Sequence, residues 1–515
     1  MIVLQEFTQP DFDLGAIVPI IATFAAAVIG VGVDAFAPAR RRALVHVSMA
    51  VVALTVSLVW AIAAIGDAPI TTFNGALAID GPAVFAQAAI AIFTLLSVFV
   101  YTERALDPAG DAFTPAGASM PGSEVERVLT LQRVRQTEVY PLTMFAAAGM
   151  MMFVASNDLL TMFVALEVLS LPLYLLSSLS RRKRLLSHEA GLKYFLLGAF
   201  ASAFFLYGSS LVYGATGSLN FTEIDAGISS RVGVDTLLLV GTGMIAVGLL
   251  FKISAVPFQF WTPDVYQGAP TPVTGFMAAA TKTAAVVALM RVFYVGLGGL
   301  VDDWTVLLWV VAAVTMLLGS VLALTQTDVK RMLAYSSIAH AGFLLVGVVS
   351  ADTAGTAAVL FYLLAYGIAT VGAFACITLV RDAAGEATHL SAWAGLGRRS
   401  PVLASVFALF LLSFAGIPLT SGFVGKLVVF AAAFDAGQWV LVLIALLSSA
   451  IAAFFYVRVI VLMFFSDPVE GGATVGVPSA GTTAVITATA LLTLLLGVVP
   501  GPVLELASMA SEFVR

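Results

Sequence analysis

Residues 237–257 read LLLVGTGMIAVGLLFKISAVP, an apolar stretch that carries a lysine and ends at a proline. A helix that crosses a bilayer needs about 20 mostly apolar residues, so this stretch is long enough to span one. Pro257 removes a backbone hydrogen bond, and unsatisfied backbone at membrane depth is tolerated only inside protein or beside a water-filled cavity. The stretch therefore predicts a transmembrane helix that is interrupted next to Lys252, inside a bundle of helices.

Similar apolar stretches fill the rest of the chain. Of its 515 residues, 60% are hydrophobic and 10% are charged, whereas soluble domains average about 45–50% apolar and about 25% charged residues. The connector at 104–138 is the one long polar loop, so no soluble domain is expected. The sequence predicts an all-α polytopic membrane protein with about 14 transmembrane helices, at 14–36, 43–65, 82–103, 139–156, 158–179, 190–214, 236–261, 272–296, 304–325, 332–350, 354–380, 401–430, 437–465 and 479–500.

Lys and Arg residues between these segments fall almost entirely on one side. Loops that face the cytoplasm carry most of the Lys and Arg residues of a membrane protein. The opposite side of this chain has only Arg231 and Arg515. Both termini are therefore expected on the non-cytoplasmic side. The sixteen residues assigned to the cytoplasmic side are Arg40, Arg41, Arg42, Arg104, Arg127, Arg133, Arg135, Arg181, Arg182, Lys183, Arg184, Lys330, Arg331, Arg381, Arg398 and Arg399.

The composition also argues against several other classes of protein. A net charge of −6 gives no basic footprint for nucleic acid. The single cysteine, Cys376, excludes a disulfide framework or a multi-cysteine metal site. The chain carries no dinucleotide glycine fingerprint and no histidine pair at haem-ligating positions. We expect neither a cofactor nor a metal in this chain.

A second interrupted segment lies in the C-terminal half, where Gly416 and Pro418 break segment 401–430 shortly before Lys426. Paired interrupted segments in corresponding halves of a transporter-like chain point to an ion site. The breaks fall in the seventh and twelfth segments, each the fourth of five, and the two groups of five begin on opposite sides. This spacing predicts one membrane domain, with helices 1–3 and the connector at 1–138, inverted repeats at 139–296 and 304–465, and a last helix at 479–500.

Six ionisable residues lie deep within predicted segments, where a charge costs about 2.5–3.5 kcal/mol on insertion scales. Such residues usually face the bundle interior, pair with one another or line an ion path. The alternatives are static ion pairs between helices, a local pair of Glu189 with Lys193, and an ordinary core histidine at position 340. Arg291 and Arg458 lie nearer to segment ends, where they can snorkel in structural roles. The six residues are Glu167, Lys193, Lys252, Lys282, His340 and Lys426.

A mechanism follows from these residue types. Burial disfavours the charged form of a lysine, and a nearby carboxylate restores it. Movement of the carboxylate or of the surrounding water would therefore switch the lysine between binding and releasing a proton. We hypothesise a proton pathway in the membrane plane through Glu167, Lys252, Lys282, His340 and Lys426. Water and hydroxyl groups would join its members, and the hydroxyls would come from Ser254, Thr281, Thr283 and Ser336.

Five stretches of the chain carry a resemblance to a known family: 157–174 (NDLLTMFVALEVLSLPLY), 193–217 (KYFLLGAFASAFFLYGSSLVYGATG), 251–275 (FKISAVPFQFWTPDVYQGAPTPVTG), 280–291 (ATKTAAVVALMR) and 330–342 (KRMLAYSSIAHAG). Across residues 80–465 the chain resembles the antiporter-like membrane subunits of respiratory complex I, together with their relatives in Mrp cation/proton antiporters and membrane hydrogenases. Within this family it is most similar to the subunit N group.

The resemblance implies fourteen helices, two inverted five-helix repeats and broken seventh and twelfth helices. By position, Glu167 resembles the family's fifth-helix glutamate, Lys252 the lysine before the seventh-helix break, and Lys282 the eighth-helix lysine. Lys426 resembles the terminal residue of the twelfth helix and disfavours the subunit M group, which has glutamate there. Lys193 resembles an additional sixth-helix lysine of the subunit N group.

The function that the resemblance implies is proton translocation driven by quinone reduction elsewhere in an NADH-quinone oxidoreductase. The complex would use FMN, iron-sulfur clusters, NADH and a quinone, none of them held by this chain. Partners would be the neighbouring antiporter-like and small membrane subunits, in a bacterial plasma membrane. The alternatives are a subunit of an Mrp-type Na⁺/H⁺ antiporter, a transporter that carries an organic substrate, and a purely structural membrane scaffold.

Overall fold

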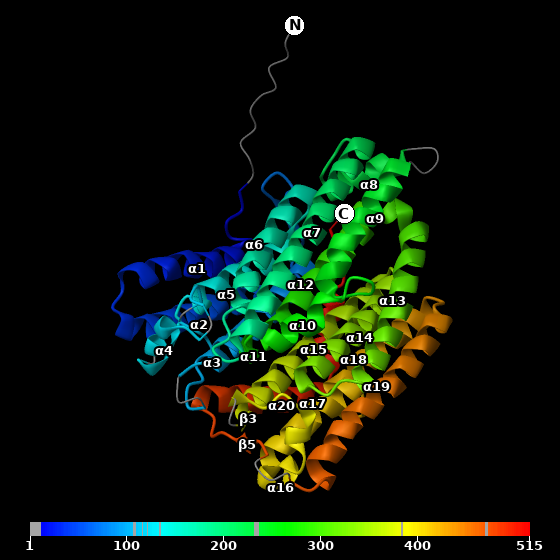
Figure 1. The fold of residues 1–515 in the computed structure, drawn as a ribbon. Coiled ribbons are helices and arrows are strands. Elements are labelled where there is room, and N and C mark those ends of the chain that lie inside the picture. Colours follow the sequence, from blue (N-terminus) through cyan, green and yellow to red (C-terminus); the bar gives the residue numbers. More distant parts are fainter. Residues whose placement is uncertain are drawn as a thin grey trace.

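The computed structural model describes residues 12–514 apart from 107–109, 116, 121, 133–134, 231–235, 383–384 and 469–471. Arg133, Arg231 and Arg515, which enter the orientation argument, lie outside the described residues. The described chain is a bundle of long helices with a few short strands at its ends (Figure 1).

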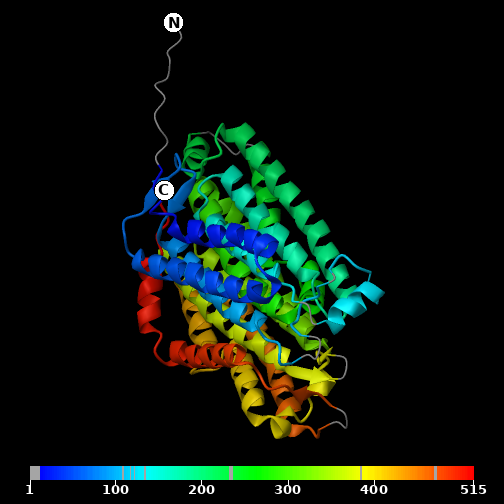
Figure 2. The same cartoon turned by 90° about the vertical axis from the view of Figure 1, so that its left-hand side faces the viewer.

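The N-terminal part contains three long helices and one hairpin. Strands β1 and β2 pair antiparallel, with Ile70 opposite Ile79. Helices α1 and α2 lie side by side on one flank of the molecule (Figure 2). The elements are α1 (Val18–Phe36), α2 (Ala39–Ala63), β1 (Ile70–Thr72), β2 (Leu77–Ile79), α3 (Gly81–Tyr101) and α4 (Glu124–Leu131).

The segment predicted as the first repeat contains one interrupted helix and one helix with two π-helical turns. The elements are α5 (Val139–Ala155), α6 (Leu159–Ser177), α7 (Arg184–Thr216), α8 (Phe221–Ser229), α9 (Thr236–Ile253), α10 (Trp261–Gly268), α11 (Thr271–Phe276), the π-helix η1 (Met277–Thr281), α12 (Lys282–Arg291) and the π-helix η2 (Val292–Gly296).

The C-terminal part also contains an interrupted helix, and its strands form a three-stranded antiparallel sheet in the order β4-β3-β5. The elements are the 3₁₀ helix η3 (Gly298–Leu300), α13 (Val301–Leu324), α14 (Val329–Val349), α15 (Thr353–Leu379), β3 (Val380–Asp382), β4 (Gly385–Glu386), the 3₁₀ helix η4 (Leu390–Trp393), α16 (Leu396–Arg399), α17 (Pro401–Ala415), α18 (Ser421–Asp435), α19 (Trp439–Phe465), β5 (Thr474–Val475), α20 (Ala480–Val498) and α21 (Gly501–Met509).

The prediction of an all-α polytopic membrane protein is confirmed. Within the described residues, twelve helices are long and apolar enough to cross a membrane, and each coincides with a predicted segment. The two other predicted segments hold shorter helices: α5 has 17 residues, and 401–430 is divided into α17 and α18 with 15 residues each. The count of fourteen crossings and the division into two inverted repeats stay predictions.

Both predicted helix interruptions are present, and the first lies between α9 and α10. The indole Nε1 of Trp261 donates a hydrogen bond of 3.0 Å to the carbonyl of Phe251. The amide of Val256 donates to Thr315 Oγ1, also at 3.0 Å. Partners inside the protein therefore satisfy backbone groups that the break removes from the helix, as a bilayer requires.

The second interruption lies between α17 and α18. Gly416 has a φ of 84° and Leu419 has a φ of 72°, in the left-handed region that a glycine adopts without steric cost. A Cβ at position 416 would also lie 3.0 Å from Cδ of Lys426. Glycine at this position thus allows the chain to turn directly beside the lysine.

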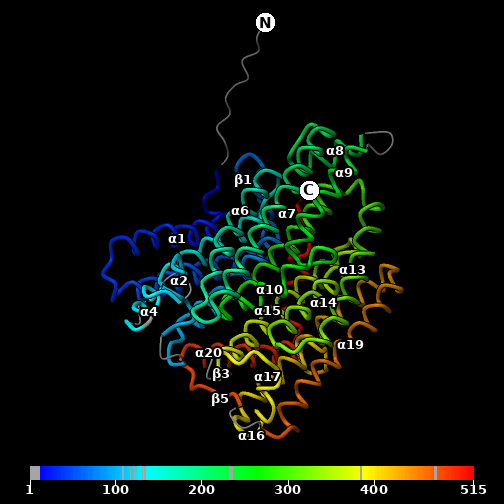
Figure 3. The backbone as a smooth tube through the Cα atoms, viewed as in Figure 1, coloured from blue at the N-terminus to red at the C-terminus, as the bar shows by residue number. Residues whose placement is uncertain are grey.

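The most deeply buried helices lie in the middle of the bundle. The segment 271–296, α14 and α15 are almost wholly buried, whereas α1, α2 and α20 bury only about a third of their residues. Figure 3 shows α1 and α2 at one edge, α13 and α19 at the opposite edge, and α10 and α15 between them. The central helices are therefore those that carry Lys282 and His340.

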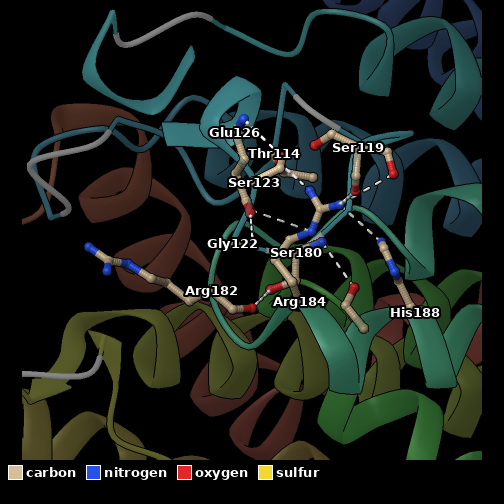
Figure 4. A network of polar contacts seen from close by, with 11 residues as sticks. Thr114, Ser119, Gly122, Ser123, Glu126, Ser180, Arg182, Arg184 and His188 are labelled. Atoms are coloured by element: carbon tan, nitrogen blue, oxygen red, sulfur yellow. Dashed lines mark hydrogen bonds and ion pairs between the residues drawn. The ribbon is translucent and has the colours of Figure 1, made fainter. Parts of the chain in front are cut away.

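The polar connector is folded in the part of it that the structure describes. Arg184, at the start of α7, bonds to the connector at several points (Figure 4). Its Nη1 donates to Thr114 Oγ1 at 2.5 Å, its Nη2 donates to the carbonyl of Ser119 at 3.2 Å, and its Nε lies 3.7 Å from Glu126 Oε1. The connector is therefore an ordered cap on one end of the bundle.

One fully buried ion pair and its hydrogen bonds join four distant parts of the chain. Arg291 Nη2 lies 2.5 Å from Asp80 Oδ1, and both side chains are completely buried. The Nε of Arg291 donates to the carbonyl of Val154 at 3.0 Å, and the amide of Val514 donates to Asp80 Oδ2 at 3.1 Å. The expectation that Arg291 snorkels is thus wrong, because Asp80 neutralises it in place.

We expect Arg291→Gln to lower the free energy of unfolding of the assembled protein in detergent by about 3–5 kcal/mol, because it leaves Asp80 buried without a counter-charge. Denaturant titration of the purified protein measures the change. Arg398→Gln is the matched control: its pair with Asp467 has side chains 59% and 90% exposed, and exposed pairs contribute about 0–1 kcal/mol. Equal losses for the two variants would contradict the assignment of Arg291 as a structural lock.

Candidate functional site

Lys252 lies in the last turn of α9, directly before the first helix break, and its side chain is buried. Its Nζ donates a hydrogen bond of 2.7 Å to Ser170 Oγ on α6. The Nζ also lies 5.5 Å from the ring centre of Tyr174 and 5.4 Å from that of Tyr194. The ammonium group is therefore held by one hydroxyl and two aromatic faces, an arrangement that favours a cation at both rings.

Glu167 lies on α6, one helical turn before Ser170, and interacts electrostatically with Lys252. Among the described residues, none donates a hydrogen bond to its buried Oε1 atom. The predicted proximity of Glu167 and Lys252 is thus present, but the two side chains form no salt bridge within the described part of the chain. The direct hydrogen-bond partner of Lys252 is Ser170, whereas the sequence analysis expected a carboxylate.

Lys282 begins α12, immediately after the π-helical turn η1, and is buried. Its Nζ donates to the carbonyl of Ser337 on α14 and lies 5.7 Å from the ring centre of Tyr366. Single π-helical turns inside α-helices occur frequently at functional sites. The neighbouring Thr281 Oγ1 is buried and has no hydrogen-bond partner among the described residues.

His340 lies on α14 between two lysines. Its Nδ1 is 2.6 Å from the hydroxyl of Tyr362, and its Nε2 is 3.3 Å from the hydroxyl of Tyr456. It interacts electrostatically with both Lys282 and Lys426. The histidine is therefore held by two tyrosine hydroxyls, and within the described residues no hydrogen bond joins it directly to either lysine.

Lys426 lies on α18 and bonds to the end of the other half of its broken helix. Its Nζ donates to the carbonyls of Phe414 at 2.9 Å and Ala415 at 3.1 Å, and to Ser449 Oγ at 2.8 Å. The Nζ lies 4.8 Å from the ring centre of Phe343. A cation at the carbonyl end of a helix is favourable for the helix dipole. The geometry of the break therefore stabilises the positive charge of Lys426.

Lys193 differs from the other five residues, because its side chain is 41% exposed on α7. It forms the predicted helical pair with Glu189 at 2.6 Å and a second pair with Asp264 at 2.5 Å. Asp264 also binds Arg331 at 2.7 Å. Within the described residues, no contact joins this charged cluster directly to Lys252.

Aromatic and hydroxyl groups occupy the space between Lys252 and Lys282. Tyr194 stacks on Trp261 with ring centres 4.5 Å apart, and Trp261 meets Tyr266 edge-on at 6.5 Å. The hydroxyl of Tyr266 lies 3.4 Å from Ser337 Oγ. Ser337 also accepts the hydrogen bond of Lys282 through its carbonyl. The first helix break therefore lines the route between the two lysines.

The hydroxyls predicted to join the lysines differ in how close they lie to the lysines and the histidine. Ser336 bonds to Tyr456 beside His340, and Ser254 accepts a hydrogen bond of 2.7 Å from Thr262 in the break. Thr283 donates only to the carbonyl of Ala279 within its own helix. Sequence reasoning missed four partners of the buried lysines and histidine, and ordinary serines and tyrosines give no signal for them: Ser170, Tyr362, Ser449 and Tyr456.

The described ranges contain no group of three or more His, Cys, Asp and Glu side chains that could hold a metal ion. The protonatable groups of the site are one carboxylate, three lysines and a histidine, and hydroxyls are among their hydrogen-bond partners.

Comparison with known proteins places these residues in a family. The family model described as NADH:quinone oxidoreductase/Mrp antiporter, TM matches residues 156–452, which include Glu167 and both helix breaks. A structural relative at low identity is a chain of the Mrp complex from Dietzia sp. DQ12-45-1b, with a TM-score of 0.79 and 23% identity, covering 97% of this chain and 96% of its own. That likeness shows a shared fold.

Relatives of higher identity narrow the family. NADH-quinone oxidoreductase subunit N of Beutenbergia cavernae is 56% identical over 99% of this chain and 100% of that protein, and the same-named subunit of Rhodococcus opacus is 54% identical over 98% and 97%. A chain of respiratory complex I from Thermus thermophilus has 34% identity and a TM-score of 0.76, covering 95% of this chain and 99% of its own. The chain belongs to the NADH-quinone oxidoreductase subunit N family of antiporter-like membrane subunits.

Proposed function

We propose that this chain is a proton-translocating membrane subunit of an NADH-quinone oxidoreductase, and that it moves protons along Glu167, Lys252, Lys282, His340 and Lys426. The observation that carries the proposal is the state of the three lysines. Lys252, Lys282 and Lys426 are 3%, 3% and 5% exposed, and their hydrogen-bond partners within the described residues are hydroxyls and carbonyls. None of them forms an ion pair within the described residues.

This arrangement argues against the static ion-pair alternative. A lysine that serves only to hold helices together is stabilised by a carboxylate within about 4 Å, because an unpaired buried charge costs several kcal/mol. Hydroxyls and carbonyls accept a hydrogen bond from the charged lysine, and a hydroxyl can also donate one to the neutral amine. The lysines are therefore placed where both protonation states have a partner.

In the first step of the proposed pathway, the ammonium group of Lys252 moves between Ser170 and Glu167. Both side chains project from the same face of α6, since residues three apart lie one above the other on a helix. With Nζ of Lys252 on Ser170, as in this structure, the lysine is separated from its carboxylate. Movement of Nζ toward Glu167 stabilises the charged lysine and favours proton uptake, and its return favours release.

The second step couples Lys282, His340 and Lys426. His340 interacts with both lysines, so a proton on either one disfavours a proton on the histidine. The phenols of Tyr362 and Tyr456 supply the hydrogen bonds along which a proton can pass. Water would supply partners for buried oxygens such as Thr281 Oγ1.

Lys193 enters the proposal at the side of the row. Its ion pair with Asp264 lies beside the first helix break, since Asp264 belongs to α10. Opening of that pair would free Lys193 to exchange a proton with the break region. This residue therefore senses the position of α10 relative to α7.

The electron-transfer chemistry would reside in partner subunits. In this proposal NADH, FMN, iron-sulfur clusters and a quinone are held elsewhere in the complex, and quinone reduction drives the proton movements in this chain. Its partners are other membrane subunits, and the proposed location is a bacterial plasma membrane with both termini on the non-cytoplasmic side. Under this reading the chain acts as part of a translocating oxidoreductase.

Lys252→Met removes the protonatable group at the first break. We expect NADH-driven proton pumping in inverted membrane vesicles to fall at least tenfold, because no other group at this position can carry the proton. Acidification is followed with a pH-sensitive dye, and NADH–ferricyanide activity reports assembly. Arg458→Gln is the control, since this exposed arginine donates only to backbone carbonyls. Normal pumping by an assembled Lys252→Met complex would contradict the proposed pathway.

Ser170→Ala tests the proposed exchange more finely. Loss of this hydroxyl leaves Lys252 with Glu167 as its remaining polar neighbour and locks the lysine in its charged form, so we expect pumping to fall about three- to tenfold while the complex stays intact. Ser177→Ala is matched, because Ser177 is also buried on α6 and donates to a carbonyl of its own helix. If both variants pump alike, Ser170 is not part of the switch.

Affinity purification separates the proposal from an Mrp-type antiporter. We expect a tagged copy at the native locus, extracted in mild detergent, to bring down flavin and iron-sulfur subunits together with NADH-dependent quinone reduction. The reason is that the proposed activity requires a redox partner. Recovery of small membrane subunits alone, without redox activity, would reject the oxidoreductase assignment.

A further inference from the structure

A pocket of about 230 Å³ opens where the connector meets the ends of α2, α3 and α5. Its lining is of two kinds: Arg104 and Arg135 are basic, and Leu44, Val47, Tyr101 and Tyr140 are apolar or aromatic. We call this site the arginine pocket. It is separate from the row of buried lysines.

Arg104 and Arg135 both line the pocket, and within the described residues neither forms a salt bridge. Burial lowers the pKa of the Arg104 guanidinium, the like charge of Arg135 lowers it further, and the charge of Asp111 offsets part of this effect. The buried Nε of Arg104 has no hydrogen-bond partner among the described residues. An anion between the two guanidinium groups would relieve the repulsion that remains.

The acid nearest to the pair is already engaged. Asp111 also lines the pocket, but its Oδ1 lies 2.7 Å from Nη2 of Arg181, and the Nε of Arg181 donates to the carbonyl of Asp111 at 2.8 Å. Arg181 and Asp111 are nearly fully buried in this contact. Asp111 therefore bonds directly to Arg181, whereas its effect on Arg104 is limited to the attraction between their charges.

The apolar part of the lining reaches the surface of the bundle at Leu44, which is 71% exposed on α2, one of the peripheral helices. Tyr101 and Tyr140 are buried and lie at the ends of α3 and α5. A ligand with a negatively charged head and a long apolar part fits the basic and the apolar residues at once.

Contacts to neighbouring helices anchor the segments that line the pocket. Arg184 and Glu126 hold the connector against α7, as described above. The hydroxyl of Thr137, which lines the pocket, donates to Asp34 Oδ1 at 2.6 Å, and Asp34 also binds His46 at 3.0 Å. The segments that carry Arg104 and Arg135 are thus tied to α7 and α1.

We propose that the arginine pocket binds the phosphate of an anionic phospholipid, with the phosphodiester between Arg104 and Arg135 and an acyl chain along Leu44 and Val47. Arginine binds phosphate oxygens in a planar, bidentate geometry. Basic pockets among membrane helices on the cytoplasmic side bind the headgroups of anionic lipids, and the sequence places both arginines on that side. The lipid would join α2, the connector and α5.

Native mass spectrometry of the purified, delipidated complex tests the proposal. Phosphatidylglycerol, phosphatidylcholine with the same acyl chains, and inorganic phosphate are added separately to the wild-type complex and to the double variant Arg104→Gln/Arg135→Gln. We expect the wild-type complex to bind phosphatidylglycerol at least tenfold more tightly than phosphatidylcholine. The double variant should lose this preference, because its pocket carries no positive charge.

Two further variants make the result decisive. Arg127→Gln removes an arginine of the same connector whose pair with Glu124 is exposed, and it should leave lipid binding unchanged. Leu44→Asp keeps both guanidinium groups and should weaken phosphatidylglycerol binding at least threefold without affecting phosphate. An equal loss in Arg127→Gln and the double variant would overturn the proposal. Equal binding of inorganic phosphate and lipid, unaffected by Leu44→Asp, would assign the pocket to free phosphate instead.

Discussion

The rest of the structure depends on the requirement that broken helices satisfy their backbone without water. Two helices stop inside the bundle, and each leaves carbonyl groups that would be exposed to hydrocarbon if the break faced lipid. At the first break an indole donates to the helix end. At the second, the ammonium group of Lys426 does so. Because these partners must be polar and buried, the breaks draw titratable and aromatic side chains into the centre of the protein.

The chain uses buried charge in two ways. Asp80 and Arg291 form a direct pair in which every change of protonation would break a contact. Lys252, Lys282 and Lys426 instead bond to neutral oxygens. Within the described residues the first set is therefore a charge-neutral pair, whereas the second set has no carboxylate at hydrogen-bond distance.

Much of this could be predicted from sequence, because the signals are local. Apolar length located the helices, proline and glycine located the breaks, and single charges in apolar runs located buried ionisable residues, except that Lys193 is partly exposed and Arg291 is buried rather than snorkelling. The partners of those residues come from other helices. Ser170, Ser449 and Tyr456 lie on distant segments and are common residue types, so nothing in the sequence pairs them with a lysine or a histidine.

Two other features depend on long-range contacts for the same reason. The connector contains prolines and glycines that resemble those of a flexible loop, yet Arg184 orders it through contacts with a segment about 60–70 residues away. Lys193 was paired correctly with Glu189 from helical spacing alone. Its second partner, Asp264, lies beyond a break whose geometry the sequence does not encode locally.

The contacts of Asp80 have a consequence for how the protein is made. Its carboxylate accepts from Arg291 and from the amide of Val514, so its two strongest partners are synthesised about 210 and 430 residues after it. Until then α3 has an unneutralised acid at its end, which is costly to bury in lipid. That end of α3 is therefore expected to stay in contact with water or protein during most of translation, and the end of the bundle at Asp80 closes last.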